Sequence, residues 1–425
     1  MTHFGIICPA ESGHLNTFIP LGKELLNRGH RVTVIASPDA QKKTIAAGLE
    51  FQPIGEDIFP LGSLKKRFTE LGKLSGLAAL KYTIELFKDT ATSVLRDAPQ
   101  VIKENEIEAL LVDQTSSEGG TVAEFVGIPF ITVCSAVVLN RDPDIAPFST
   151  TWKYSPNWTG RLRNKLGYQI LNRVVKPRYD VLVEYRQKWN LPLDASVNSL
   201  YSPIAQISHQ SAELEYPRKT LPKWFHFTGP YHYSAEREPV AFPWEKLTGQ
   251  PLIYASMGTL QNRLIDVFKK IASACQGLDA QLVMTLGGSA TPESLPELPG
   301  NPLVVSYAPQ LEILQKATLV ITHGGMNTVL ESLTNGVPMV AIPVANDQPG
   351  IAARVAWTGA GEMIPLKKLT VEKLQKAVKQ VLTEDSYKNN ALRLQEGIKQ
   401  AGGVKKAADI IEQAVATREP VLAGV

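Results

Sequence analysis

The sequence has little cysteine and no long apolar run. Its three cysteines, Cys8, Cys134 and Cys275, are widely separated and have apolar neighbours. An odd number of isolated cysteines favours neither a disulfide framework nor a zinc site, and it fits a reducing cytoplasm. No segment reaches the roughly 18 consecutive apolar residues of a membrane span, and the first residues lack the pattern of a signal peptide. We therefore expect a cytoplasmic protein that neither spans a membrane nor follows the usual secretion route.

The chain also lacks a strong excess of charge of either sign. Its 44 lysines and arginines and 41 acidic residues leave a formal net charge of +3. This balance argues against a dedicated nucleic-acid-binding protein. Residues 151–200 are an exception, because they hold nine basic and three acidic side chains.

Two series of short apolar runs alternate with helical patterns along the 425 residues, a length that itself favours two domains. The first series has runs at residues 4–9, 31–36, 109–112 and 129–134, and the second has runs at residues 252–255, 281–286, 303–306, 319–322 and 338–342. A strand, a helix and a strand within so few residues allow only a βαβ crossover. The pattern predicts an α/β fold with two Rossmann-like domains, each with a parallel sheet.

The expected domain boundaries follow from where this periodicity stops. Proline-containing pairs such as Leu221-Pro222, Gly229-Pro230 and Phe242-Pro243 indicate an interdomain linker. We expect an N-terminal domain over residues 1–220, a linker over 221–250, a C-terminal domain over 251–405, and a closing helix and tail over 406–425.

The strongest functional signal is a glycine-rich turn between an apolar strand and a helix. The turn is His323-Gly324-Gly325-Met326-Asn327-Thr328, without the lysine of a Walker motif. Backbone N–H groups at a helix N-terminus bind anions, and His323, Asn327 and Thr328 add hydrogen-bond donors. Glu331 lies one helical turn beyond Asn327, where a carboxylate can accept from two ribose hydroxyls. The pattern indicates a nucleotide site, although such turns also begin purely structural helices in α/β folds.

Further blocks surround this turn in a fixed order. They are Tyr307-Ala308-Pro309-Gln310, His323-Gly324-Gly325, Asn327-Thr328, Glu331-Ser332, Gly336-Val337-Pro338 with Pro343, and Asp347-Gln348. Together they resemble the donor-binding box of the UDP-glycosyltransferase family, glycosyltransferase family 1. Ser256-Met257-Gly258-Thr259 resembles a second element of that family, and the likeness spans nearly the whole chain. The resemblance implies the GT-B fold, in which an acceptor-binding N-terminal domain and a nucleotide-sugar-binding C-terminal domain face each other across a cleft.

The resemblance also implies a role for each matched residue. It places Tyr307 on the uracil, Gln310 and Glu331 on the ribose, His323, Gly325, Asn327, Thr328 and Thr259 on the diphosphate, and Asp347 with Gln348 on the donor sugar. Tyr307 stands where plant members have tryptophan, so the sequence resembles the microbial branch that includes zeaxanthin and macrolide glucosyltransferases. UDP is favoured over TDP as the nucleotide. No cofactor is implied, because the UDP-sugar is a co-substrate.

His14 and Asp113 are the candidate catalytic pair. Each follows a predicted strand, and open α/β sheets bind ligands at the carboxyl ends of their strands. A neutral imidazole can remove the proton of an acceptor hydroxyl, and a carboxylate can hold its tautomer. A surface histidine and a helix-capping aspartate are the structural alternatives. Both residues match the base and its partner in the family, which implies inversion at the anomeric carbon.

An acidic pair, Asp142-Pro143-Asp144, is the one sequence feature that suggests a metal site. Two carboxylates near a diphosphate often hold Mg²⁺. Here the proline between them restricts their geometry, and the N-terminus of the helix after Gly325 already compensates phosphate charge. We therefore expect an enzyme without a metal.

The acceptor is expected to contact the N-terminal domain, as the resemblance implies. Residues 59–87 and 137–175 are rich in large apolar side chains interleaved with lysine and arginine. They fit a lipophilic hydroxylated small molecule or contact with a membrane surface, and they fit ordinary amphipathic surface helices equally well.

The overall prediction is transfer of a hexose from a UDP-sugar to a hydroxyl of an apolar small molecule such as a carotenoid, polyphenol or macrolide. Glucose is the expected hexose. A UDP-sugar epimerase of the same architecture is the alternative. An NAD-dependent oxidoreductase is disfavoured because the turn after the first strand lacks G-x-G-x-x-G. A catalytically silent binding module is disfavoured because His14 and Asp113 are both retained.

Overall fold

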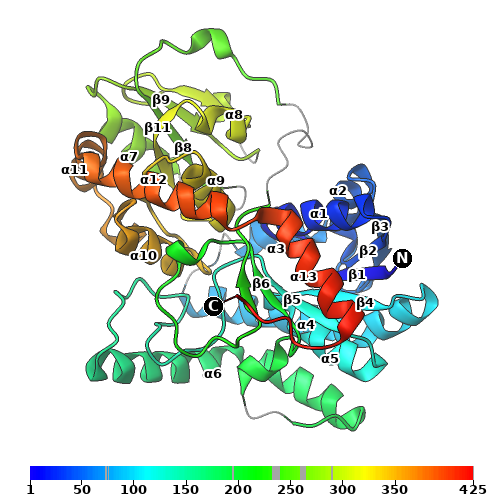
Figure 1. The fold of residues 1–425 in the computed structure, drawn as a ribbon. Helices are drawn as coiled ribbons and strands as arrows, with labels where there is room; N and C mark the ends of the chain where they lie inside the picture. The colour runs from blue at the N-terminus through cyan, green and yellow to red at the C-terminus, as the bar shows by residue number, and fades with distance from the viewer. Residues whose placement is uncertain are drawn as a thin grey trace.

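Two parallel sheets, each covered by helices on both faces, form the two halves of the protein in the computed structural model (Figure 1). The structure describes residues 1–71, 74, 76–193, 196–231, 240–258, 265–288 and 291–424. The N-terminal strands are β1 (His3–Ile7), β2 (Arg31–Ala36), β3 (Glu50–Pro53), β4 (Ala109–Asp113), β5 (Phe130–Cys134), β6 (Gln206–Ser208) and β7 (Phe225–Phe227). The C-terminal strands are β8 (Leu252–Ser256), β9 (Gln281–Thr285), β10 (Leu303–Val305), β11 (Ala317–Thr322), β12 (Met339–Ala341) and β13 (Gly361–Met363).

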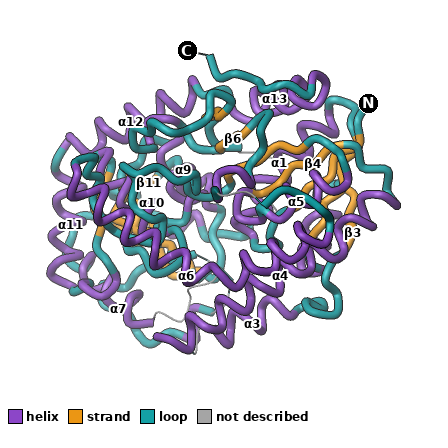
Figure 2. The backbone as a smooth tube through the Cα atoms, turned by 90° about the horizontal axis from the view of Figure 1, so that it is seen from below, coloured by secondary structure: helices purple, strands orange, loops and turns teal. Residues whose placement is uncertain are grey.

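Thirteen α-helices lie among the described residues. They are α1 (Ser12–Asn27), α2 (Gln41–Ala46), α3 (Ser63–Leu71), α4 (Gly76–Glu104), α5 (Glu118–Val126), α6 (Trp158–Lys188), α7 (Ile265–Cys275), α8 (Gln310–Leu314), α9 (Met326–Thr334), α10 (Gln348–Thr358), α11 (Val371–Thr383), α12 (Asp385–Gln400) and α13 (Gly403–Thr417). Figure 2 shows these helices around the strands from below.

The strand order explains where a ligand can bind. The seven-stranded sheet has the order β3-β2-β1-β4-β5-β6-β7, the six-stranded sheet has the order β10-β9-β8-β11-β12-β13, and every pair of neighbouring strands is parallel. The winding reverses between β1 and β4 and again between β8 and β11. Such switch points open a crevice at the carboxyl ends of the strands. The predicted fold class, two Rossmann-like domains with parallel sheets, is confirmed.

The strands are apolar on both faces because both faces are buried. In β1, Phe4 and Ile6 pack against α1 and α13, whereas Ile7 packs on the opposite face against α4 and α5. The six-stranded sheet repeats the arrangement, with α7 and α11 on one face and α9, α10 and α12 on the other. Strands of this kind have near-continuous apolar sequences rather than alternating ones, which is why short apolar runs predicted them.

The predicted linker over residues 221–250 needs a correction. It contains β7, which pairs with β6 and therefore belongs to the N-terminal sheet. A strand of three residues between Pro222 and Gly229 is too short to show a periodicity. The closing helix also begins slightly earlier than predicted, at Gly403, whose N–H donates to the carbonyl of Thr228.

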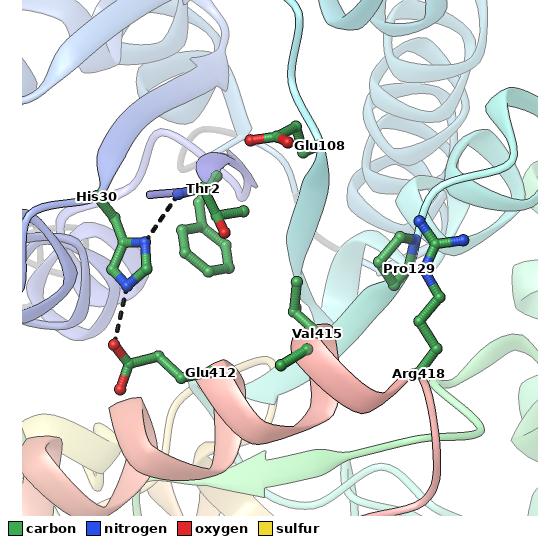
Figure 3. A pocket seen from close by; sticks show the side chains of 9 residues that line it. Thr2, His30, Glu108, Pro129, Glu412, Val415 and Arg418 are labelled. Atoms are coloured by element: carbon green, nitrogen blue, oxygen red, sulfur yellow. Dashed lines mark hydrogen bonds and ion pairs between the residues drawn. The ribbon is translucent and has the colours of Figure 1, made fainter.

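Helix α13 returns to the N-terminal half and packs against α1 (Figure 1). Arg28, just after α1, donates to Asp409 and Glu412 at 2.6 Å each. His30 accepts from the N–H of Thr2 at 3.1 Å and donates to Glu412 at 2.8 Å. Figure 3 shows His30 in this position, beside a pocket at the amino ends of β1, β4 and β5. This attachment lies at the opposite edge of the sheet from the predicted catalytic pair.

A buried ion cluster joins the two halves near the cleft. Glu215, between β6 and β7, accepts from Nε and Nη2 of Arg354 in α10 at 2.9 and 2.7 Å. Arg218 lies 3.4 Å from the same carboxylate, and Gln210 donates to it at 2.9 Å. The Arg354 guanidinium also stacks over the ring of Tyr216, 4.6 Å from its centre. Because all the charged side chains are buried, removing one of them leaves an uncompensated charge.

We expect Arg354→Met to destabilise the protein by about 3 kcal/mol, the low end for a broken buried pair, because Arg218 still faces Glu215. The midpoint of thermal unfolding, measured by calorimetry, should fall clearly. The exposed pair Lys176–Asp180 provides the matched control. Lys176→Met should change stability by less than about 1 kcal/mol. Equal effects of the two substitutions would contradict the role given to the buried cluster.

Candidate active site

His14 and Asp113 lie in direct contact at the switch point between β1 and β4. His14 is the third residue of α1, directly after the loop that follows β1, and Asp113 is the last residue of β4. Nδ1 of His14 is 2.8 Å from Oδ2 of Asp113. A carboxylate accepts, so Nδ1 carries the proton and Nε2 is left as the basic nitrogen. The pairing of β1 with β4 brings these two residues together from 99 positions apart.

Asp113 is held by its surroundings as well as by His14. Its Oδ1 accepts from the N–H and the hydroxyl of Thr115 at 2.7 and 2.6 Å, which caps the short helix that follows β4. The structural interpretation of Asp113 as a capping residue is therefore correct for one oxygen, while the second oxygen serves His14. The carboxylate is buried and cannot rotate away from the imidazole.

Ser135 is a third member of this cluster that the sequence analysis missed. Its hydroxyl donates to Oδ2 of Asp113 at 2.5 Å and lies 2.8 Å from Nδ1 of His14. Ser135 directly follows β5, the neighbour of β4, and the strand register places it two positions beyond the level of Asp113. A polar residue after the fourth predicted strand was the available signal.

The glycine-rich turn after β11 forms a tight cradle around His323. A side-chain Cβ at Gly258 or at Gly325 would come within 2.7 or 2.6 Å of His323 Nε2, so both positions require glycine. Gly324 has a φ of +84°, which glycine adopts without strain. Burial lowers the pKa of His323 to about 4, so the imidazole is neutral and offers a single N–H. Helix α9 begins directly after this cradle.

Asn327 and Thr328 stand in the first turn of α9. Asn327 Nδ2 donates to the carbonyl of Gly13 in the N-terminal half at 2.8 Å, next to His14. The Thr328 hydroxyl lies 3.4 Å from Nε2 of Gln310. Asn327, one of the predicted diphosphate residues, is thus hydrogen-bonded to the residue that precedes the predicted base.

The residues predicted to bind the nucleoside also cluster. Gln310 Nε2 donates to Glu331 at 2.6 Å, and the hydroxyl of Tyr254, which the sequence analysis did not select, donates to Gln310 Oε1 at 3.1 Å. One face of the Tyr307 ring covers Gly288, where a Cβ would overlap the ring, and the side chain is 52% exposed. An aromatic ring that is fixed on one face and half exposed is suited to stacking.

Asp347 and Gln348 complete the cluster from the start of α10, where Asp347 is the N-cap and Gln348 the first helical residue. The Gln348 amide oxygen accepts from the N–H groups of Val344 and Ala345 at 2.9 and 3.0 Å, so it holds the loop. Asp347 accepts from the N–H of Val137 in the N-terminal half at 3.3 Å. Burial raises the pKa of Asp347, and the nearby His14 opposes this shift.

Thr259 lies outside the described residues, so the structure places only its neighbour Gly258. Asp142 and Asp144 are engaged elsewhere. Asp142 accepts from the N–H groups of Asp144, Lys219 and Thr220, and Asp144 pairs with Arg161 at 2.5 Å. Within the described ranges, no three His, Cys, Asp or Glu side chains gather as ligands for a metal ion.

The chain matches the family model "UDP-glucoronosyl and UDP-glucosyl transferase" over residues 6–401. It belongs to this family. It is 33% identical over 426 residues to the zeaxanthin glucosyltransferase of Pantoea ananas, with 100% of this chain and 98% of the relative covered. It is 29% identical over 423 residues to the enzyme of the same name from Pseudescherichia vulneris, with 99% and 100% covered.

Solved structures agree on the architecture. The calicheamicin glycosyltransferase CalG4 superposes with a TM-score of 0.77 at 22% identity, over 99% of this chain and 100% of that one. The glycotransferase of kitacinnamycin gives a TM-score of 0.76 at 24% identity, over 97% and 98%. The chain therefore has the GT-B fold, and by its family it is a UDP-dependent glycosyltransferase.

The charge balance around His14 decides the protonation state of this glycosyltransferase at rest. Burial lowers the pKa of the imidazole, but three effects outweigh burial and raise the pKa to about 9. They are the charge of Asp113, the hydrogen bond that His14 donates to Asp113, and the charges of the more distant Glu11 and Asp347. At neutral pH the free enzyme therefore carries an imidazolium next to a carboxylate. As the predicted base, His14 must be neutral to act, and with this pKa only a minor fraction of the imidazole is neutral at pH 7.

We expect kcat/KM to rise with pH through an acid limb near pH 9, because kcat/KM reports the ionisation of the free enzyme. The rate should change about tenfold per pH unit below the limb. Asp113→Asn removes the charge that raises the pKa of His14, so the limb should move toward acidic pH while the maximal rate falls. The measurement is a pH–rate profile of both proteins. A limb that stays at the same pH in Asp113→Asn would show that another group titrates.

Proposed function

We propose that this chain transfers glucose from UDP-glucose to a hydroxyl of an apolar small molecule, with inversion at the anomeric carbon and without a metal ion. The main support for this proposal is that the His14–Asp113 pair lies close to the start of α9. Asn327 in the first turn of α9 bonds to Gly13, the neighbour of His14, at 2.8 Å. In this proposal the acceptor hydroxyl lies at His14 and the diphosphate at the start of α9, so the anomeric carbon lies between them.

The chemical step follows from this arrangement. Nε2 of His14 removes the proton of the acceptor hydroxyl while the hydroxyl oxygen forms a bond to the anomeric carbon. The bond from that carbon to the diphosphate oxygen breaks, and its electron pair leaves with UDP. Attack from the face opposite the leaving group inverts the anomeric centre. Asp113 stabilises the imidazolium that results, and Ser135 holds both partners in register.

The diphosphate charge is compensated by dipoles and hydrogen bonds in this proposal. The N-terminus of α9 offers backbone N–H groups, and Thr328 adds a hydroxyl. His323 supplies one N–H from a neutral ring, and Gly325 allows the phosphate to approach the backbone. The carboxylates of Asp142 and Asp144 are committed to backbone groups and to Arg161, which supports a mechanism without a metal.

The remaining residues of the site are assigned to the nucleoside and the donor sugar. We propose that uracil stacks on the exposed face of Tyr307 and that Gln310 and Glu331 bind the ribose hydroxyls. Asp347 and the amide nitrogen of Gln348 bind hydroxyls of glucose. Asp347 lies at the boundary between the two halves, where it accepts from the N–H of Val137, and this position supports a role at the donor sugar.

The acceptor is proposed to be a long apolar molecule with a hydroxyl, such as a carotenoid, and the other candidates are polyphenols and macrolides. The names of the two zeaxanthin glucosyltransferases support the carotenoid and glucose assignments. One neighbouring structure, the glycosyltransferase VinC, contains DTDP, so thymidine-linked sugars are the comparison donors. No helix in the described ranges is long and apolar enough to cross a membrane. We propose that the enzyme works in the cytoplasm at a membrane surface, where such acceptors reside.

We expect mass spectrometry to show a glucosylated product when UDP-glucose and a hydroxylated carotenoid are supplied, with less product from TDP-glucose and with activity retained in EDTA. His14→Ala should lower turnover about 10²- to 10⁴-fold, the usual contribution of a positioned base. Its affinity for UDP should stay near wild type. Interconversion of UDP-sugars without any transfer product would favour the epimerase, and loss of activity in EDTA that Mg²⁺ restores would contradict the metal-free mechanism.

The ribose assignment has its own test. Glu331→Ala should raise the dissociation constant of UDP roughly 10- to 150-fold, because a paired hydrogen bond to a charged group contributes about 1.5–3 kcal/mol. Isothermal titration calorimetry measures this directly. Glu312→Ala, at an exposed position on α8, is the control and should leave UDP binding unchanged. Weakened acceptor binding with unchanged UDP binding in Glu331→Ala would overturn the assignment of the C-terminal half to the nucleotide.

A further inference from the structure

Helix α6 carries an apolar row on its outer face. Trp158, Leu162, Leu166 and Ile170 are spaced four residues apart and are 76, 51, 53 and 61% exposed. Side chains at this spacing share one side of a helix, and the row is about 18 Å long. Exposed apolar residues are normally scattered singly, so a continuous row indicates a contact surface.

The underside of α6 is fixed to the protein, which keeps the row facing outward. Gly160, Asn164 and Gly167 are buried on the opposite face. Gly167 is held so closely against Trp152 and Pro147 that a Cβ there would come within 2.8 Å of the tryptophan ring. Figure 1 shows α6 along the lower edge of the molecule, and Figure 2, drawn from below, shows it facing the viewer.

The chain segment that carries the row is basic. From residue 151 to residue 179 it has seven basic side chains and no acidic one. Arg161, Lys165 and Arg173, spaced four and eight residues apart, are exposed beside the apolar row. Arg161 pairs with Asp144, so the field at the surface comes mainly from Lys165 and Arg173, with Lys153 close to the first turn.

An exposed apolar row could contact either a second copy of the chain or a lipid bilayer. The basic side chains beside the row distinguish between the two. A second copy of the chain would bring the same cationic side chains against one another about a two-fold axis, and like charges would repel. An anionic bilayer satisfies both sets of side chains, because its headgroups attract the cations and its acyl boundary accepts the apolar side chains. Tryptophan, which begins the row, favours the bilayer interface.

The helix is also connected to the proposed acceptor side. Residues 136–157 lead from Ser135 at the catalytic cluster to the first turn of α6, where Asn157 caps the helix by accepting from Gly160. Asn164 donates to the carbonyl of Pro143 at 3.0 Å, within the same segment. A surface that contacts α6 therefore lies beside the segment that borders the cleft.

We propose that α6 docks on the surface of an anionic lipid bilayer through Trp158, Leu162, Leu166 and Ile170, with Lys165 and Arg173 against the headgroups. The link from docking to acceptor supply rests on the proposed function, whereas docking itself does not. Docking at this face brings the N-terminal half to the bilayer and leaves the nucleotide site to the aqueous phase.

The test is co-sedimentation of the full-length protein with vesicles of phosphatidylcholine alone and of phosphatidylcholine with phosphatidylglycerol. We expect binding to the anionic vesicles only, weakened by salt. The double substitution Leu166→Ser with Ile170→Ser should weaken this binding at least about tenfold, because two large apolar side chains no longer enter the bilayer. The control Ile45→Ser with Leu422→Ser, at comparably exposed apolar positions elsewhere, should bind as the wild type does.

Three outcomes would overturn the proposal. The first is that wild-type protein does not bind anionic vesicles, and the second is that both double variants lose binding equally. The third is that light scattering shows a dimer which Leu166→Ser with Ile170→Ser dissociates, which would make α6 a protein interface. Glucosyl transfer to a water-soluble phenol, measured in the same variants, should be unchanged and shows that they are folded. Failure of transfer in the wild type with intact vesicle binding would count against the proposed function alone.

Discussion

The parallel direction of every strand pair is the constraint on which the site depends. Parallel strands end at the same edge of a sheet, and the winding of each sheet reverses between two of its neighbours, β1 and β4 or β8 and β11. At these points the connecting helices leave in opposite directions and the strand ends are uncovered. His14 follows β1 and Asp113 ends β4, whereas Gly258 and His323 follow β8 and β11. The two uncovered edges face each other, which Asn327 and Gly13 demonstrate by their hydrogen bond.

The two histidines of the candidate site, His14 and His323, lie in different electrostatic surroundings. The pKa values of these two histidines are shifted in opposite directions, because the charge of Asp113 raises that of His14 whereas burial lowers that of His323. In the proposed mechanism, the diphosphate would meet neutral donors and a helix N-terminus rather than a cation that would compete with the base. Arg354 provides a further buried charge at the interface between the two halves. It binds Glu215 of the N-terminal half and the carbonyl of Gly350, in the first turn of the helix that begins at Gln348.

Local sequence predicted the elements that are long or strongly patterned, and it failed where an element is short. The run at residues 31–36 and the glycine-rich turn at His323 were visible because buried parallel strands are apolar throughout and a phosphate cradle needs small residues. Strand β7 was assigned to a linker because three residues between a proline and a glycine carry no periodicity. Ser135 was missed because its role comes from the pairing of β5 with β4, which no local pattern records.

The sequence by itself determined the fold class, the family and the candidate donor residues, because these depend on apolar runs, helix starts and ordered blocks that are local in the chain. Only the tertiary structure decided which side chains touch. It joined His14 to Asp113 across 99 positions, gave one oxygen of Asp113 to a helix cap and the other to the imidazole, and turned Asn327 toward the opposite domain. It also decided that one row of α6 faces outward. Hydrogen bonds and burial depend on the angle and distance between elements, and these are set by packing that brings together residues far apart in the sequence.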